Sequence, residues 1–263
     1  MKIKPVFFAV LGIIILAQAQ ASEAAVIGTY TGPAAGEGLD LDGEFLYAIN
    51  AGAGGIFGTS PDITIRDATF SDDFNNAQLI TGVTFFGGSL DPFNTAPDFG
   101  TTPADDNLES VLTSIALPSQ GEGRLTYEMS VTPGQAYKLQ VILSENNFGA
   151  GLNPGNREMD YLLYSGAFTN DPAGDGRTIY DQALNVITGD GFDRFQVITM
   201  EFTATDPTVT LWARPPATPT DVSYDNVSII NAVTLEIPEP ATMLLMGPGL
   251  LVLSARSRRR SRA

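Results

Sequence analysis

The sequence of 263 residues contains neither cysteine nor histidine, and it contains a single tryptophan. Without cysteine, the fold must be held by burial of apolar side chains and not by disulfides. The two absences also exclude Ser-His-Asp and Cys-His nucleophile systems, together with zinc sites built from histidine and cysteine. The enzymatic chemistry that remains is that of paired carboxylates, as in glycoside hydrolysis.

Basic residues are scarce: 14 lysines and arginines stand against 30 acidic residues, and the formal net charge is −16. Two of the bases precede residue 22 and five follow residue 236, so residues 22–236 hold seven bases beside 29 acids. A surface this negative repels phosphate backbones, and we therefore expect no nucleic-acid partner. It attracts divalent cations and favours solubility in a polymer matrix.

The N-terminal residues have the pattern of a secretory signal. Lys2 and Lys4 precede an apolar stretch over 6–17, and residues 17–21 offer two overlapping Ala-Gln-Ala cleavage sites. We predict that residues 1–21 are a signal peptide that is removed on export. A retained N-terminal anchor is the alternative, although the apolar stretch is short for a membrane span.

The last 27 residues have a three-part layout of Pro238-Glu239-Pro240, a 15-residue apolar run over 241–255, and an arginine cluster. The cluster consists of Arg256, Arg258, Arg259, Arg260 and Arg262. The apolar run is shorter than the roughly 20 residues that a helix needs to cross a bilayer, so it inserts by thinning the bilayer or stretching with its flanks. Cationic segments stay cytoplasmic, which predicts that the chain before Pro238 lies across the membrane.

This layout resembles a PEP-CTERM sorting signal. The resemblance implies that a membrane exosortase recognises residues 237–263 and cuts near the tripeptide, in Gram-negative bacteria that make exopolysaccharide. The signal residues are Pro238, Glu239, Pro240, Arg256, Arg258, Arg259 and Arg260. It implies an exported protein of the cell surface or extracellular matrix, transiently anchored by a C-terminal transmembrane helix. An ordinary tail anchor is the alternative, but the tripeptide directly before so short a helix argues against it.

Residues 22–236 are expected to form one all-β domain, because short apolar alternations are separated by turns and no long segment keeps a helical period. The expected strands cover 45–50, 63–65, 67–70, 78–86, 125–131, 137–145, 160–166, 196–203, 209–214 and 222–230. The strands at 196–203 and 209–214 are expected to pair across Asp206-Pro207. Three prolines predict a long loop over 91–107, and 108–117 reads as a strand or one helical turn. Pro133 and Gly134 predict a turn over 132–135.

From Tyr137 onward the core resembles malectin-like jelly rolls: a strand ends in Glu145, and Arg157-x-x-Asp160 and a glycine turn at Gly166 follow. Residues 224–229 resemble the closing strand of galactose-binding-type β-sandwiches. The resemblance implies an antiparallel β-sandwich of jelly-roll type, flanked by the signal helix and the transmembrane helix. It also implies a non-catalytic module that binds carbohydrate.

Four aromatic residues are the candidate ligand contacts. Trp212 alternates with Val209, Leu211 and Ala213, so it falls on the opposite face of its strand, where it either binds a sugar ring or covers the sheet. Phe148, Tyr180 and Phe192 are expected in glycine-rich loops, where aromatic side chains either bind ligands or anchor the loop.

Calcium is the cofactor that the composition favours most, because carboxylates and loop carbonyls supply its oxygen ligands. The candidate ligands are Asp40, Asp42 and Asp225; Glu44, Asp171 and Asp175 are further acids in similar clusters. Neither the acids at 40–44 nor those at 171–175 have the spacing of an EF-hand loop. The alternative is that these acids simply form a solvated, negatively charged surface.

We therefore expect an exported, non-catalytic β-sandwich that is associated with exopolysaccharide or another glycan. Two alternatives stay open: an enzyme that acts on glycosides through carboxylates, and a purely structural matrix protein.

Overall fold

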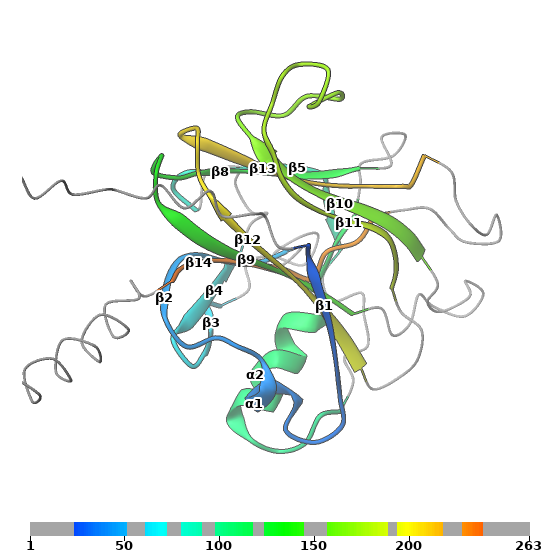
Figure 1. Cartoon of the computed structure of the whole chain (residues 1–263). Coiled ribbons are helices and arrows are strands. Elements are labelled where there is room, and N and C mark those ends of the chain that lie inside the picture. Colours follow the sequence, from blue (N-terminus) through cyan, green and yellow to red (C-terminus); the bar gives the residue numbers. More distant parts are fainter. Residues whose placement is uncertain are drawn as a thin grey trace, which may run out of the picture.

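The computed structural model describes residues 24–51, 61–72, 80–90, 98–117, 124–144, 157–188, 194–217 and 228–238. These residues form a sandwich of a seven-stranded and a five-stranded sheet (Figure 1). They also include a two-stranded sheet. The predicted antiparallel β-sandwich is confirmed. The predicted signal helix and the predicted C-terminal transmembrane helix lie outside the described residues.

The larger sheet is almost entirely antiparallel. Its strands are β1 (Val26–Thr31), β2 (Glu44–Asn50), β3 (Ile63–Ile65), β4 (Ala68–Asp72), β9 (Ala136–Leu143), β12 (Arg194–Thr203) and β14 (Ala232–Ile237). They follow the order β1-β12-β9-β14-β2-β4-β3, and the β2–β4 pair is parallel. The strand β14, which comes last in the sequence, therefore lies in the middle of the sheet, between β9 and β2.

The smaller sheet has the order β11-β10-β13-β8-β5. Its strands are β5 (Val83–Phe86), β8 (Leu125–Ser130), β10 (Arg157–Ser165), β11 (Ile179–Thr188) and β13 (Thr208–Arg214). Strands β6 (Gly88–Leu90) and β7 (Ile115–Leu117) form the two-stranded sheet.

The main core lies between the two large sheets. The alternation along β9 places Tyr137, Leu139, Val141 and Leu143 in this core, as the sequence predicts. Alternate residues of β13 enter the same core from the smaller sheet: Val209, Leu211 and Ala213. Because successive side chains of a strand point to opposite faces, the intervening residues of each strand face away from this core.

A second buried cluster covers the other face of the larger sheet, where α1 (Ala35–Gly38) and α2 (Pro103–Leu112) lie below the sheet in Figure 1. Leu108 and Val111 of α2 belong to this cluster, together with Phe195 and Val197 of β12. The larger sheet is thus buried on both faces, and the fold has three layers.

The helix α2 corrects the expectation of a loop over 91–107 and of a strand or single turn over 108–117. The Oγ1 of Thr102 accepts the N–H of Asp105 at 3.2 Å, and Pro103 follows this N-cap residue as the first helical residue. Proline is well tolerated there, since its missing N–H would have no partner within the helix. Proline usually indicates a loop because it interrupts a strand or a helix, but Pro103 stands at the first position of a helix.

The buried carboxylate of Asp105 holds the two helices together. Its Oδ1 accepts the N–H of Gly36 at 3.0 Å, and its Oδ2 accepts the hydroxyl of Thr102 at 2.8 Å. A Cβ at Gly36 would lie 2.7 Å from the carbonyl oxygen of Ala104, so only glycine allows this close approach.

The expected pairing of residues 196–203 with 209–214 is wrong. Strand β12 pairs with β1 and β9, whereas β13 pairs with β10 and β8 in the other sheet. The segment between them crosses from one sheet to the other. It is tied to the predicted turn at 132–135, because the N–H of Gly134 donates to the carbonyl of Ala204 at 2.7 Å.

The closing strand also differs from the expectation of 222–230. In its described part, 228–230, only Ile230 takes part in an isolated bridge, to Ala116. The strand that closes the fold is β14, which begins two residues later and continues to Ile237.

Candidate functional site

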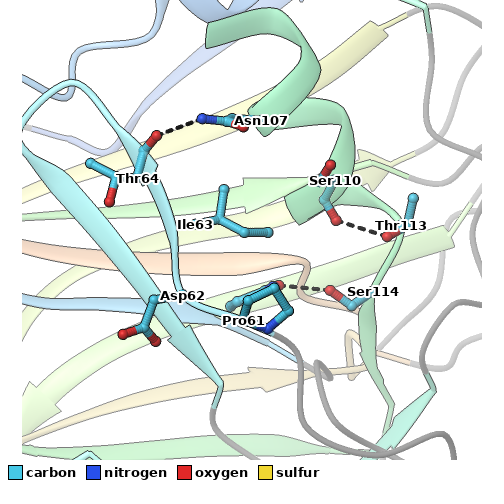
Figure 2. A pocket seen from close by; sticks show the side chains of 9 residues that line it. Pro61, Asp62, Ile63, Thr64, Asn107, Ser110, Thr113 and Ser114 are labelled. Carbon is cyan, nitrogen blue, oxygen red and sulfur yellow. Dashed lines mark hydrogen bonds between the residues drawn. The ribbon is translucent and has the colours of Figure 1, made fainter. Parts of the chain in front are cut away.

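A pocket of about 500 Å³ opens between α2 and the start of β3 (Figure 2). Apart from Pro61 and Ile63, its lining within the described part of the chain is polar, with no aromatic side chain and a single charged one: Asn50, Pro61, Asp62, Ile63, Thr64, Asn107, Ser110, Thr113 and Ser114. Binding pockets for small molecules have volumes of roughly 300–1,000 Å³. The pocket is therefore large enough for a small ligand, and its lining is unusually rich in hydroxyl and amide groups.

The helix α2 builds one wall of the pocket because it is amphipathic. Asn107 and Ser110 are three residues apart and lie on one face, and Thr113 and Ser114 continue this face past the helix end. The opposite face carries Leu108, Val111 and Leu112, which are fully buried against the larger sheet. Burial of the apolar face thus fixes where the hydroxyl groups point.

Hydrogen bonds join the helix wall to the strands around it. The Nδ2 of Asn107 donates to the carbonyl of Thr64 at 2.7 Å, which ties the helix to β3 at one end of the pocket (Figure 2). At the floor, the hydroxyl of Ser114 donates to the Oδ1 of Asn50 at 2.6 Å. Asn50 is only 2% exposed, so the pocket rests on a fixed base.

Sequence reasoning missed this pocket, because it placed a loop where α2 begins. The N-cap at Thr102 followed by Pro103 would have shown the helix start. From that start, the helical spacing of Asn107 and Ser110 would have placed both on one face. Nothing local to these residues shows that β3 lies opposite.

Trp212 lies on the outer face of the smaller sheet, opposite to the core-facing residues of β13, as the alternation predicts. Its side chain is 5% exposed. The ring of Phe168 meets it edge-on at 5.6 Å, and the guanidinium of Arg214 lies 4.5 Å above its centre. Because its ring is already covered, Trp212 does not offer an open stacking surface for a sugar.

Tyr180 lies in β11, so the expectation of a loop position is wrong. It is 6% exposed, and its ring packs against Phe202 at 4.8 Å in the core between the sheets. Its hydroxyl accepts the N–H of Thr205 at 2.8 Å. Tyr180 thus closes one end of the sandwich. The other two candidate aromatic residues, Phe148 and Phe192, lie outside the described residues.

The candidate calcium ligands Asp40 and Asp42 have separate basic partners. Asp40 pairs with Lys138 at 2.8 Å, and Asp42 pairs with Arg66 at the same distance. Asp225 lies outside the described part of the chain. Within that part, no group of three or more acidic residues is arranged to hold a metal ion.

Asp171 and Asp175 share one loop. The Oδ1 of Asp171 accepts the N–H of Gly174 at 3.0 Å, and the carboxylate of Asp175 accepts the hydroxyl of Thr169. These bonds stabilise the turn between β10 and β11. Calcium binding stays a prediction for this protein.

An ion-pair network surrounds the end of β14. Lys138 of β9 lies opposite Glu236 of β14, and its ammonium group pairs with both Glu236 and Asp40. Burial by itself lowers the pKa of Lys138, but the hydrogen bonds and negative charges of the two carboxylates outweigh burial and raise this pKa above its ordinary value. The network joins the segment after α1 to the central strands of the larger sheet.

Residues 236–260 match the PEP-CTERM protein-sorting motif. This finding confirms the resemblance seen in the sequence, and the motif implies export and processing by an exosortase-type enzyme. The match begins inside β14 at Glu236, and Pro238 is half-buried directly after the strand. The other signal residues, from Glu239 to Arg260, lie outside the described residues. Across the described ranges, none of the helices has the length and apolar character needed to span a bilayer.

No curated protein matches the chain. Among solved structures, it is similar to the extracellular domains of ANXUR2 and ANXUR1 from Arabidopsis thaliana, each with 13% identity and a TM-score of 0.40. These alignments cover 73% and 74% of this chain and 41% and 51% of the other two chains. A plant receptor-like kinase, ANX2, aligns with a TM-score of 0.42 and 13% identity over 74% of this chain and 51% of its own. The chain thus spans about two fifths to one half of the length of these solved chains.

Proposed function

We propose that this protein is an exported, non-catalytic β-sandwich that associates with the polysaccharide around the producing cell. The observation that carries the proposal is the sorting motif, which matches residues 236–260 and is joined to the central strand β14 without a spacer. The β-sandwich itself is therefore the part of the protein that the motif would sort. A hydroxyl-lined and amide-lined pocket in the sandwich supports a ligand that makes many hydrogen bonds.

Removal of residues 239–263 should leave folding and export intact but change the final location of the protein. The truncation ends after Pro238, so β14 and its pairing with β9 and β2 are kept. Cell fractionation with antibody detection would measure the distribution between membrane, surface and medium. A truncated protein that is found where the full chain is found would contradict sorting through this motif.

A second variant separates a sorting signal from an ordinary tail anchor. Replacing Pro238, Glu239 and Pro240 by alanine keeps the apolar run and the arginine cluster. A tail anchor depends on hydrophobicity and flanking charge. If residues 237–263 were such an anchor, the variant and the wild type would therefore both remain in the membrane at full length. For a signal that is read by an exosortase-type enzyme, we expect the variant to stay in the membrane unprocessed.

Association with polysaccharide is tested by co-sedimentation of the exported protein with exopolysaccharide isolated from the same cells. We expect saturable binding, and we expect no release of reducing sugar during the incubation. Release of reducing sugar would favour the carboxylate-dependent enzyme. A folded protein that stays in the supernatant would favour a structural matrix component.

Calcium binding by this protein is tested by chelation. A metal that binds the native state raises the melting temperature by mass action, so a calcium-bound protein should melt at a lower temperature after addition of a chelator. An unchanged melting temperature would remove calcium from the proposal.

A further inference from the structure

We propose that the pocket between α2 and β3 binds an uncharged sugar unit through the hydroxyl groups of that sugar. The inference rests on the proposed carbohydrate association and names its site and the class of glycan. It follows from which hydrogen-bonding atoms of the lining are already used within the protein and which remain for a ligand.

The hydroxyl hydrogens of the helix wall point back into the protein. The Oγ of Ser110 donates to the carbonyl of Asp106 at 3.0 Å, and the Oγ1 of Thr113 donates to the carbonyl of Ser110 at 2.7 Å. Each hydroxyl has one hydrogen and two lone pairs, so the lone pairs are what these groups offer to the pocket. The hydroxyl groups of Ser110 and Thr113 therefore accept hydrogen bonds from a ligand and do not donate them.

Two further groups of the lining use hydrogens within the protein. Ser114 uses its hydrogen on the Oδ1 of Asn50, and Asn107 uses a hydrogen of its Nδ2 on the carbonyl of Thr64. Asp62, which is exposed at the pocket mouth, adds a carboxylate that accepts when ionised. The amide groups of Asn50 and Asn107 add donors to these acceptors. The hydroxyl groups of a sugar suit such a lining, because each of them both donates and accepts.

Charge excludes acidic sugars from this class. Among the lining residues that the structure describes, Asp62 is the single charged one, and the wall is the C-terminal half of α2, where the helix dipole is negative. The chain as a whole carries a formal charge of −16. A uronic acid or a sulfated sugar would be repelled, whereas an uncharged hexose unit meets no such barrier.

The experiment uses the exported protein as the cell processes it, with three probes: an uncharged glucan oligosaccharide, an oligogalacturonate, and a chitosan oligosaccharide with free amino groups. Calorimetry or ligand-observed NMR gives the affinities. We expect the uncharged glucan to bind with the highest affinity. Preference for the oligogalacturonate would overturn the charge argument. Preference for chitosan that is lost in Asp62→Asn would identify an ammonium site and overturn the uncharged class.

Two substitutions at the exposed Ser110 test the location of the site. Ser110→Ala removes one acceptor and should weaken glucan binding about threefold to tenfold, the loss expected for one neutral hydrogen bond. Ser110→Leu places an apolar side chain in the pocket and should abolish binding. Ser130→Ala is the matched control, because Ser130 is also exposed but ends β8 in the other sheet. Unchanged melting temperatures would show that every variant folds.

The outcomes separate this inference from the proposed function. Glucan binding that Ser110→Leu leaves intact would overturn the pocket as the site and keep the carbohydrate association. Failure of all three probes, together with failure to sediment with the exopolysaccharide, would overturn both. Loss of binding in Ser110→Leu with retention in Ser130→Ala would support the site.

Discussion

Asn231→Leu is expected to destabilise the protein by about 3–5 kcal/mol, the largest effect that we expect from a single substitution. Asn231 is fully buried where α2, β9 and β14 meet. Its Oδ1 accepts the N–H of Ser144 at 2.6 Å, and its Nδ2 donates to the carbonyls of Ser114 and Leu112 at 2.9 and 3.2 Å. Leucine has a similar volume but no polar atoms, so it removes all three bonds. Loss of a partner for a buried polar group costs about 1–3 kcal/mol.

Urea unfolding followed by circular dichroism would measure this change. Thr234→Val is the matched control, because Thr234 is also fully buried on the adjoining strand and its hydroxyl lies 3.4 Å from the Oε1 of Gln140. A bond this long is weak, and we expect the control to lose less than about 1 kcal/mol. Similar losses in the two variants would show that Asn231 has no special role at the junction.

Lys138→Met is expected to destabilise the protein by about 2–4 kcal/mol, because it leaves the carboxylate of Glu236 buried without its cation. The side chain of Lys138 is 14% exposed and that of Glu236 is 9% exposed, so solvent screens their interaction only weakly. The double variant Lys138→Met/Glu236→Leu removes both charges and should recover much of this stability. Lys138→Arg, which keeps the charge, is the milder control. If the double variant is less stable than Lys138→Met, the ion pair is not the cause.

The stability contributed by Lys138 is expected to depend on pH. The pKa of Lys138 is raised in the folded protein, so its charged form is favoured by folding. The stabilisation is then fully present below the unfolded pKa of about 10.4 and is lost as the pH rises through the folded pKa. Above about pH 10.4 the wild type should therefore approach the stability of Lys138→Met. If the difference in unfolding free energy between the wild type and Lys138→Met stays constant up to a pH of about 12, the predicted pH dependence is wrong.

Local patterns predicted most of the strands correctly. Alternation along 137–143 and 209–213 identified the faces that form the core, because a strand buries every second side chain wherever it lies in a sheet. The turn at 132–135 was also local, since Pro133 and Gly134 meet the backbone needs of its two central positions, and Gly134 has a φ of +84°. These features depend only on neighbouring residues.

Three errors arose where a local pattern had more than one solution. Prolines indicated a loop around residue 103, although Thr102 and Pro103 start a helix. Closeness in sequence predicts that β12 pairs with β13, but a short connection can also cross between two sheets. The glycines before Tyr180 indicate a loop, although the strand β11 already begins at Ile179.

The sequence by itself determined the sorting motif, the negative charge, the absence of histidine and cysteine chemistry, and the β-rich character of the core. Each of these is a property of composition or of residues next to one another. Tertiary structure alone decided the partners of Lys138, which meets Asp40 across 98 positions, and of Asn231, which meets Leu112 across 119. It also decided that Asn50 and Asp62 line the same pocket as the residues of α2. Such contacts depend on how sheets and helices stack to bury their apolar faces, and no local pattern encodes that choice.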